Sequence, residues 1–336
     1  MVIMKTFFFI LVLFCCLVAA CGPNDPKFPI EETITPELMP LQGITNPIRV
    51  EVSHLFLILQ NMIRTDSLFH IYNLTDCELK SAFGVEGRGP GEYVLPWLFH
   101  TQLPDVLIGN AGKNAVSRFE INENGQPVFK DVKQANSISY ITDAAFINDS
   151  LYVISAIDND PSLYLLSWED DFPRKTRQFR SSNITDFYED PDQADVYANE
   201  SRVVLCYYWK KQIDFMDIDL NLIKRVEFKF DYPTTVITPK EEENAKVTYV
   251  HAYLGKRYLY ASFIGATWND HRVSQSALGT FLEVYDLDGK PVARYCLNGI
   301  RPVHFAVDEE TFTLYGAGDR GNPVDNLLVY KLDGLL

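Results

Sequence analysis

The chain has 336 residues, of which 47% are hydrophobic and 13% aromatic, so it can bury a large core. It carries 45 acidic and 30 basic residues, for a net charge of −15. An acidic surface of this size repels phosphate backbones, which excludes nucleic acid as a partner. The simplest interpretation of the acidity is solubility, and the alternative is a cation or a basic peptide as partner.

The N-terminus has the pattern of an export signal. Lys5 supplies a positive charge, and the apolar run 6–18 is too short to span a bilayer but suits the core of a signal peptide. The small residues before Cys21 resemble the lipobox of bacterial lipoproteins. That resemblance implies cleavage before Cys21 and a diacylglyceryl lipid, of the palmitate type, on its sulfur; a secretory signal with a chance cysteine is the alternative. The predicted parts are a signal peptide at 1–20, a flexible tether at 21–32 and an exported domain at 33–336.

Three cysteines remain after the predicted lipid site. Cys77, Cys206 and Cys296 are odd in number and widely spaced, which is not the pattern of a disulfide framework. No Cys/His cluster has zinc spacing. We expect mostly buried, small apolar side chains, and one disulfide among the three stays open.

A β-hairpin recurs along the chain. In each copy an apolar strand leads into a polar turn, as at Asn124-Gly125, Asp288-Gly289 and Asp333-Gly334, where glycine supplies the positive φ of a tight turn. A repeat of roughly 50 residues in an all-β chain is typical of propeller blades. The strands that lead into the hairpins are predicted near residues 67, 115, 161, 211, 280 and 326.

The repeat predicts an all-β, six-bladed β-propeller. Its one long interval holds 231–244 and 265–279, so we expect insertions around blade five. The last hairpin leaves its blade without an outer strand, and an open ring would expose unpaired edges. The segment 33–41 can fill that place, because its prolines are tolerated on an outer edge strand. We therefore expect the last blade to be closed by an N-terminal strand.

One motif lies where the first blade passes to the second. It resembles the Gly-x-Gly-Pro-Gly-Glu-aromatic segment of TolB-like six-bladed propeller lipoproteins of the Bacteroidetes type. The resemblance implies the lipobox, the tether and the six repeats, and the family carries no agreed catalytic residues to transfer. The matching residues are Gly87, Gly89, Pro90, Gly91, Glu92 and Tyr93.

The motif has two interpretations. Its glycines reach backbone angles closed to other residues and its proline fixes the next one, which favours a tight turn between blades. Alternatively, its N–H groups form a concavity for an anion, helped by Arg88. Pro96 argues against the helix that a nucleotide-binding loop would need.

Histidines are the candidates for chemistry in the central channel. The blade positions place His100, His251 and His304 on or near innermost strands, where three imidazoles could hold zinc or another metal. Packing histidines are the alternative, and a shift of one residue would turn a side chain to the other face. Asp158-Asn159-Asp160 has some character of a calcium loop, with a solvated turn as the alternative.

No catalytic signature stands out, so we expect a monomeric binding or scaffold lipoprotein rather than an enzyme. Its ligand would be a peptide, a glycan or an envelope protein. The alternative is a metal-dependent, lactonase-like hydrolase, by analogy at the level of fold, and a sensor accessory is a third. We expect the cell envelope as location, with the periplasmic and surface faces both open.

Overall fold

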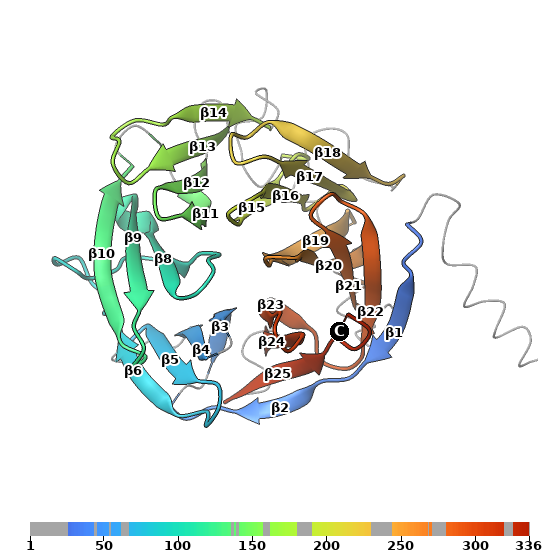
Figure 1. Ribbon diagram of the computed structural model, residues 1–336, viewed down its shortest axis with the longest axis horizontal. Helices are drawn as coiled ribbons and strands as arrows, with labels where there is room; N and C mark the ends of the chain where they lie inside the picture. Colours follow the sequence, from blue (N-terminus) through green and yellow to red (C-terminus); the bar gives the residue numbers. More distant parts are fainter. Residues whose placement is uncertain are drawn as a thin grey trace, which may run out of the picture.

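In the computed structural model the chain forms a ring of six β-sheets around a central axis (Figure 1). Five sheets have four strands and the sixth has five. Within the described part of the chain, no helix is long and apolar enough to cross a membrane. The structure describes residues 26–43, 46–53, 55–61, 67–135, 138, 141–156, 162–179, 190–229, 244–267, 269–270, 280–318 and 325–335.

Each blade is an antiparallel sheet whose strands follow one another from the axis outwards. Blade one holds β3 (Pro47–Val52), β4 (Phe56–Asn61), β5 (Phe69–Asn73) and β6 (Leu79–Phe83). Blade two holds β7 (Pro96–Leu98), β8 (Asp105–Asn110), a 3₁₀ turn η1 (Ala111–Lys113), β9 (Ala115–Ile121) and β10 (Pro127–Gln134). Blade three holds β11 (Ile141–Asn148), β12 (Leu151–Ala156), β13 (Ser162–Ser167) and β14 (Lys175–Gln178).

The other three blades repeat this order. Blade four holds β15 (Ala194–Ala198), β16 (Val203–Tyr207), β17 (Gln212–Met216) and β18 (Leu222–Glu227). Blade five holds β19 (Lys246–Leu254), β20 (Tyr258–Thr267), β21 (Thr280–Asp286) and β22 (Pro291–Leu297). Blade six holds β23 (Pro302–Asp308), β24 (Thr313–Gly318) and β25 (Asn326–Lys331).

The six-bladed propeller predicted from the repeat is confirmed. The hairpin strands are the third strands of the blades, namely β5, β9, β13, β17, β21 and β25. Gly125, Gly289 and Gly334 have φ angles of 73°, 76° and 84°, as the turns require. Of the two predicted insertions, 230–243 and 271–279 lie outside the described residues, and β20 takes in the start of the second.

The N-terminal segment closes the ring, as predicted. Strand β2 (Glu37–Pro40) pairs antiparallel with β25 and becomes the outer strand of blade six. A second strand, β1 (Ile30–Ile34), adds parallel to β22 as the fifth strand of blade five. The predicted closing segment 33–41 is therefore too long at its start, because Pro36 lacks an N–H and separates the two strands.

The chain packs against blade five before β1 begins. Phe28 is only 7% exposed, and its ring meets that of Tyr285 edge-on at 5.6 Å. The tether predicted to reach residue 32 therefore ends earlier, since burial of the Phe28 ring ties the segment to the rim. The signal peptide, Cys21 and the start of the tether lie outside the described residues.

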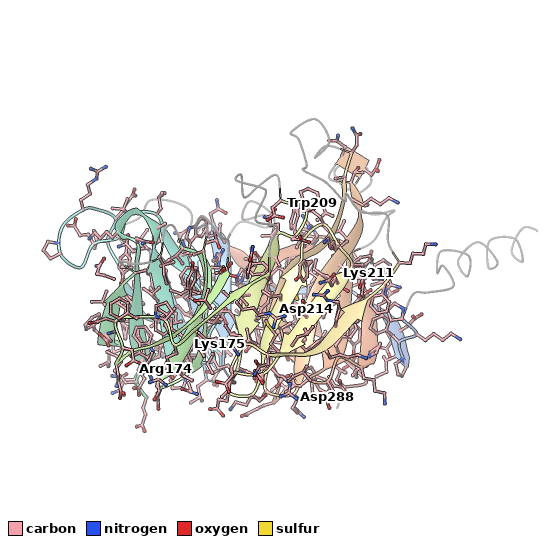
Figure 2. The ribbon with its side chains drawn as sticks, turned by 90° about the horizontal axis from the view of Figure 1, so that it is seen from above. Arg174, Lys175, Trp209, Lys211, Asp214 and Asp288 are labelled. Atoms are coloured by element: carbon pink, nitrogen blue, oxygen red, sulfur yellow. The ribbon has the colours of Figure 1, made fainter. Side chains whose placement is uncertain are left out.

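The two faces of the disc can be distinguished by the direction of the innermost strands. Four antiparallel strands return the chain to the same face, so all six innermost strands run in one direction. We call the face where they begin the entry face and the face where they end the exit face. Figure 2 shows the disc from the side, with Trp209 and Lys211 toward the entry face and Asp288, in the turn from β21 to β22, toward the exit face.

A buried ion network joins blades four and five. Lys211, only 2% exposed, lies 3.4 Å from the Glu283 carboxylate, and Arg294 approaches the same oxygen at 3.5 Å. The other oxygen accepts hydrogen bonds from the hydroxyls of Tyr249 and Tyr285 at 3.0 and 2.8 Å. The one carboxylate therefore faces two cations and two hydroxyl donors, which offset the cost of burying it.

Candidate functional site

Hydrogen bonds near the axis join each blade to the next one around the ring. Five of the six use a polar side chain of an inner strand, and the sixth, between blades two and three, joins two backbones. Inner strands therefore have polar positions that serve the assembly of the ring. The six links are Arg49 Nη1 to Leu98 O (2.9 Å), Phe146 N to His100 O (3.2 Å), Val196 N to Asp143 Oδ2 (3.1 Å), Ala252 N to Tyr197 Oη (2.8 Å), His251 Nε2 to Phe305 O (2.9 Å) and Val50 N to His304 Nδ1 (3.2 Å).

Two of the predicted histidines meet at the axis. The rings of His251 and His304 lie 3.9 Å apart between centroids, on β19 and β23. Burial, with the Arg49 charge nearby, lowers the pKa of His251 to about 3 and holds the pKa of His304 well below its usual value. Both rings are neutral at pH 7, with the proton of His304 on Nε2, because its Nδ1 accepts the N–H of Val50.

The third predicted histidine joins blade two to blade five, on opposite sides of the axis. His100 follows β7 in blade two, and its Nε2 lies 3.2 Å from the carbonyl oxygen of Leu254 in blade five. Its ring meets the rings of Tyr253 and Tyr197 edge-on, at 5.0 and 5.7 Å. All these side chains are buried.

The positions and hydrogen bonds of the axial histidines can be compared with what a metal site requires. Among the described residues no group of three or more His, Cys, Asp or Glu is placed to hold a metal. Nδ1 of His304 accepts the N–H of Val50, and Nε2 of His251 donates to Phe305 O. One nitrogen of each ring is therefore unavailable as a metal ligand. The predicted calcium loop 158–160 lies outside the described residues.

Four half-exposed or exposed side chains, which we call the entry mouth, surround the axis at the entry face. The side chains of Arg49, Asp143 and Asp195 are half-buried, and Trp97 is 39% exposed. The Arg49 guanidinium lies over the Trp97 ring at 4.8 Å. A positive charge, two carboxyls and an aromatic face therefore meet solvent at one place.

The two carboxyls of the entry mouth share an unusual environment. Burial raises the pKa of Asp143, the charge of Asp195 raises it further, and Arg49 opposes both effects. Burial likewise raises the pKa of Asp195, again against Arg49. Like charges near each other cannot both ionise easily, so the pair keeps a proton to higher pH than ordinary carboxyls do.

The sequence analysis missed the carboxyls because it considered only histidines as channel residues. A usable signal was present. Asp143 and Asp195 each stand near the start of an innermost strand, next to small or β-branched apolar residues, in consecutive blades. A charged side chain at the same place in two neighbouring repeats indicates a shared position at the axis.

The glycine motif forms a turn at the entry face, between β6 and β7. The N–H of Gly89 donates to the Glu92 carboxylate at 2.6 Å, and the N–H of Gly87 donates to Tyr93 O at 2.9 Å. Lys113 Nζ donates to the carbonyls of Gly89 and Glu92, at 2.7 Å each. The motif therefore forms a turn whose N–H groups are bonded within the turn itself. Anion binding stays a prediction, and an anion would have to displace the Glu92 carboxylate. The side chain of Arg88 is exposed.

Comparison with known proteins agrees with this architecture. A family model described as TolB-like 6-blade propeller-like matches residues 31–310. The chain belongs to this TolB-like propeller family.

One solved structure shares the fold at low identity, and a second is similar at a lower score. A crystal structure of a Bacteroides fragilis NCTC 9343 protein, described as exported, aligns with a TM-score of 0.55 and 12% identity over 86% of this chain and 88% of that one. The β-propeller domain of Swd1 from Myceliophteria thermophila aligns with a TM-score of 0.48 and 10% identity over 88% and 99%. No curated protein matches the chain.

Proposed function

We propose that the chain is an exported, membrane-anchored binding module whose entry mouth is the binding surface. The observation that carries this proposal is the convergence of Arg49, Asp143, Asp195 and Trp97 at one end of the axis. Arg49 and Asp143 also belong to the ring of hydrogen bonds between blades, which supports a rigid platform and lowers the cost of ordering a site on binding.

The partner that best suits the entry mouth is a peptide segment of an envelope protein. Arg49 and the carboxyls can pair charged side chains of either sign, and the exposed Trp97 face can cover an apolar one. A glycan and a folded envelope protein are the other outcomes of the test.

Binding can be followed through Trp97. Residues 26–336 would be titrated with peptides and with glycans by calorimetry and tryptophan fluorescence. We expect Trp97→Ala and Asp195→Asn to weaken peptide binding about tenfold, since each removes a contact worth on the order of 1–2 kcal/mol. The exposed Phe172, at the exit face, gives the control Phe172→Ala. Equal affinity in all four proteins would refute the entry mouth as the site.

Export and anchoring rest on Cys21 and the apolar run before it, and the similarity to a protein described as exported agrees with them. Only four residues lie between Cys21 and Pro26, which is buried on the rim. At about 3.5 Å per residue, the lipid would hold that rim within roughly 20 Å of the membrane. Cys21→Ala should release the protein from the membrane fraction and remove the lipid mass from the N-terminal peptide. Retention of both in Cys21→Ala would contradict the anchor.

A hydrolase is the second candidate, and the raised pKa of Asp143 and Asp195 favours it. One protonated and one ionised carboxyl can act as general acid and base. Hydrolysis of ester or lactone substrates that Asp143→Asn abolishes would support it. Turnover with a metal requirement would support the metal-dependent form.

A further inference from the structure

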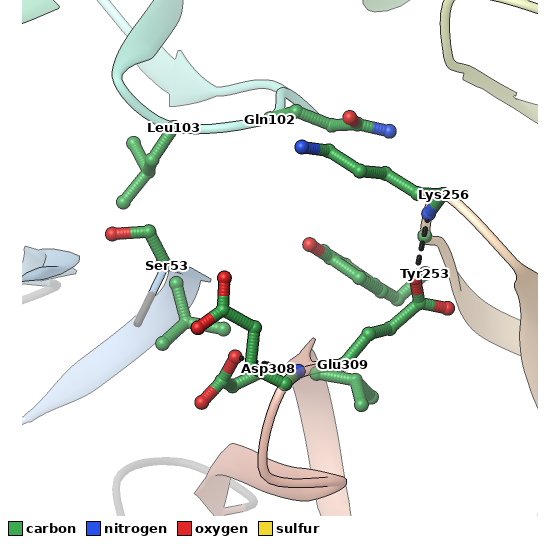
Figure 3. A pocket seen from close by; sticks show the side chains of 11 residues that line it. Ser53, Gln102, Leu103, Tyr253, Lys256, Asp308 and Glu309 are labelled. Atoms are coloured by element: carbon green, nitrogen blue, oxygen red, sulfur yellow. Dashed lines mark hydrogen bonds between the residues drawn. The ribbon is translucent and has the colours of Figure 1, made fainter. Parts of the chain in front are cut away.

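A pocket of about 110 Å³ lies at the exit face, where β3, β19 and β23 end; Figure 3 shows the side chains that line it. Its walls come from four blades, because the inner strands of blades one, five and six end there beside the loop that follows β7 in blade two. The polar side chains that line it include Ser53, Gln102, Tyr253, Lys256 and Asp308.

The acidic wall of the pocket is already engaged. The Glu309 carboxylate accepts the N–H groups of Lys256, Arg257 and Tyr258, at 2.8 to 3.3 Å. Each oxygen of Asp308 accepts one hydrogen bond, from Glu310 N at 3.1 Å and from the Thr311 hydroxyl at 2.7 Å. These carboxylates are held in place by the fold, with lone pairs left over.

Hydrogen-bond donors in the pocket, by contrast, are without partners among the described residues. Tyr253 is only 5% exposed, its hydroxyl makes no hydrogen bond, and it points into the pocket in Figure 3. Gln102 Nε2 is buried and also has no partner. Burial and nearby carboxylates raise the pKa of Tyr253, so its hydroxyl keeps its proton. Buried polar groups such as Gln102 Nε2 rarely remain unpaired, and the Tyr253 hydroxyl is open to a ligand or to water.

The charges around the pocket select the class of ligand. An anion would face Asp308 and Glu309, and a cation would face Lys256 and the two unpaired donors. An uncharged hydroxyl avoids both conflicts, because it accepts from Tyr253 and Gln102 and donates to the spare lone pairs of Asp308.

The size of the pocket limits how much of the ligand enters. A cavity needs about 10–15 Å³ to admit one water, so 110 Å³ has room for several adjacent hydroxyls. We propose that the exit-face pocket around Tyr253, Gln102 and Asp308 binds the hydroxylated edge of a terminal sugar residue. No residue of the entry mouth takes part, so this site stands or falls independently of the proposed function.

The test uses residues 26–336 with glucose, galactose and N-acetylglucosamine, and with acetate and methylammonium as charged counterparts. Saturation-transfer NMR detects binding, and titration gives the affinity. We expect at least one sugar to bind, and Tyr253→Phe and Gln102→Leu each to weaken it about fivefold, the loss of one hydrogen bond. Tyr330→Phe is the matched control, because that hydroxyl donates to Ile300 O at 2.7 Å outside the pocket.

Thermal melting separates loss of the site from loss of the fold. Tyr253→Phe removes a hydroxyl without a partner, so its melting temperature should equal or exceed that of the parent, whereas Tyr330→Phe should melt lower. The proposal is overturned if no sugar binds, if a charged compound binds more tightly than every sugar, or if Tyr253→Phe binds sugar as the parent does.

Discussion

His304 Nδ1 accepts the backbone N–H of Val50 at 3.2 Å, across 254 positions of sequence. This bond lies at the inner edge of the junction between blades six and one. The outer strand of blade six is β2, from the same N-terminal segment. The first and last blades are therefore joined near the axis by a side chain, while the N-terminal strand completes blade six and leads directly into β3 of blade one.

Replacing His304 tests the inner half of this closure. Val50 is fully buried, so His304→Leu leaves its N–H without an acceptor inside the protein. An unpaired buried donor costs about 1–3 kcal/mol, and we expect the free energy of unfolding to fall by about that amount. Urea denaturation followed by circular dichroism measures it. A loss below about 0.5 kcal/mol would show that the bond is unimportant for closure.

Stepwise truncation tests the outer half. Chains that begin at residues 26, 35 and 41 keep both N-terminal strands, β2 alone, or neither. Stability should fall in that order, and the chain that begins at 41 should aggregate, because β25 becomes an open edge. Melting temperature and light scattering give the two readouts. Equal melting of the chains beginning at 35 and 41 would contradict the role of β2.

The fold was predictable because its signals are local. Asp-Gly and Asn-Gly turns, and the spacing between them, depend on short stretches of chain, so they fix the number of blades and the third strand of each. The division of 30–40 into two strands was not predictable, because blade five already has four strands and no repeat signal indicates that β1 adds to β22 as a fifth. In the entry mouth, the equivalent positions of Asp143 and Asp195 in consecutive blades could have been read from the repeat, whereas the approach of Arg49 to Trp97 of the next blade is set by the packing of the blades.

Below neutral pH, the axial histidines and the two carboxyls of the entry mouth should have opposite effects on the free energy of unfolding. His251 has a pKa of about 3 in the folded chain and about 6.5 when unfolded. Below about pH 6.5 the unfolded chain therefore binds a proton at His251 that the folded chain does not bind, and stability falls as the pH drops. Asp143 and Asp195 act the other way, because their raised pKa values let the folded chain hold protons that the unfolded chain has lost.

The double variant Asp143→Asn/Asp195→Asn separates these contributions. The double variant keeps His251 and His304 but loses the two carboxyls, whose effect on stability opposes that of the histidines. The free energy of unfolding of the variant should therefore fall more steeply than that of the parent between pH 7 and pH 4.5. Each histidine contributes at most about 1.4 kcal/mol per pH unit. Urea midpoints at four pH values measure the slope, and parallel curves for the two proteins would refute the opposition.

The glycine motif offers a test of why its first glycine cannot carry a side chain. A Cβ on Gly87 would lie 2.0 Å from Glu92 Oε2, the oxygen that accepts the N–H of Gly89. Gly87→Ala should therefore displace the carboxylate and destabilise the protein by about 1–3 kcal/mol. In a Glu92→Ala background the space is open, and the same substitution should cost less than about 0.5 kcal/mol. Urea denaturation of the four proteins completes the double-mutant cycle. Equal costs in the two backgrounds would mean that Glu92 is not what requires glycine at this position.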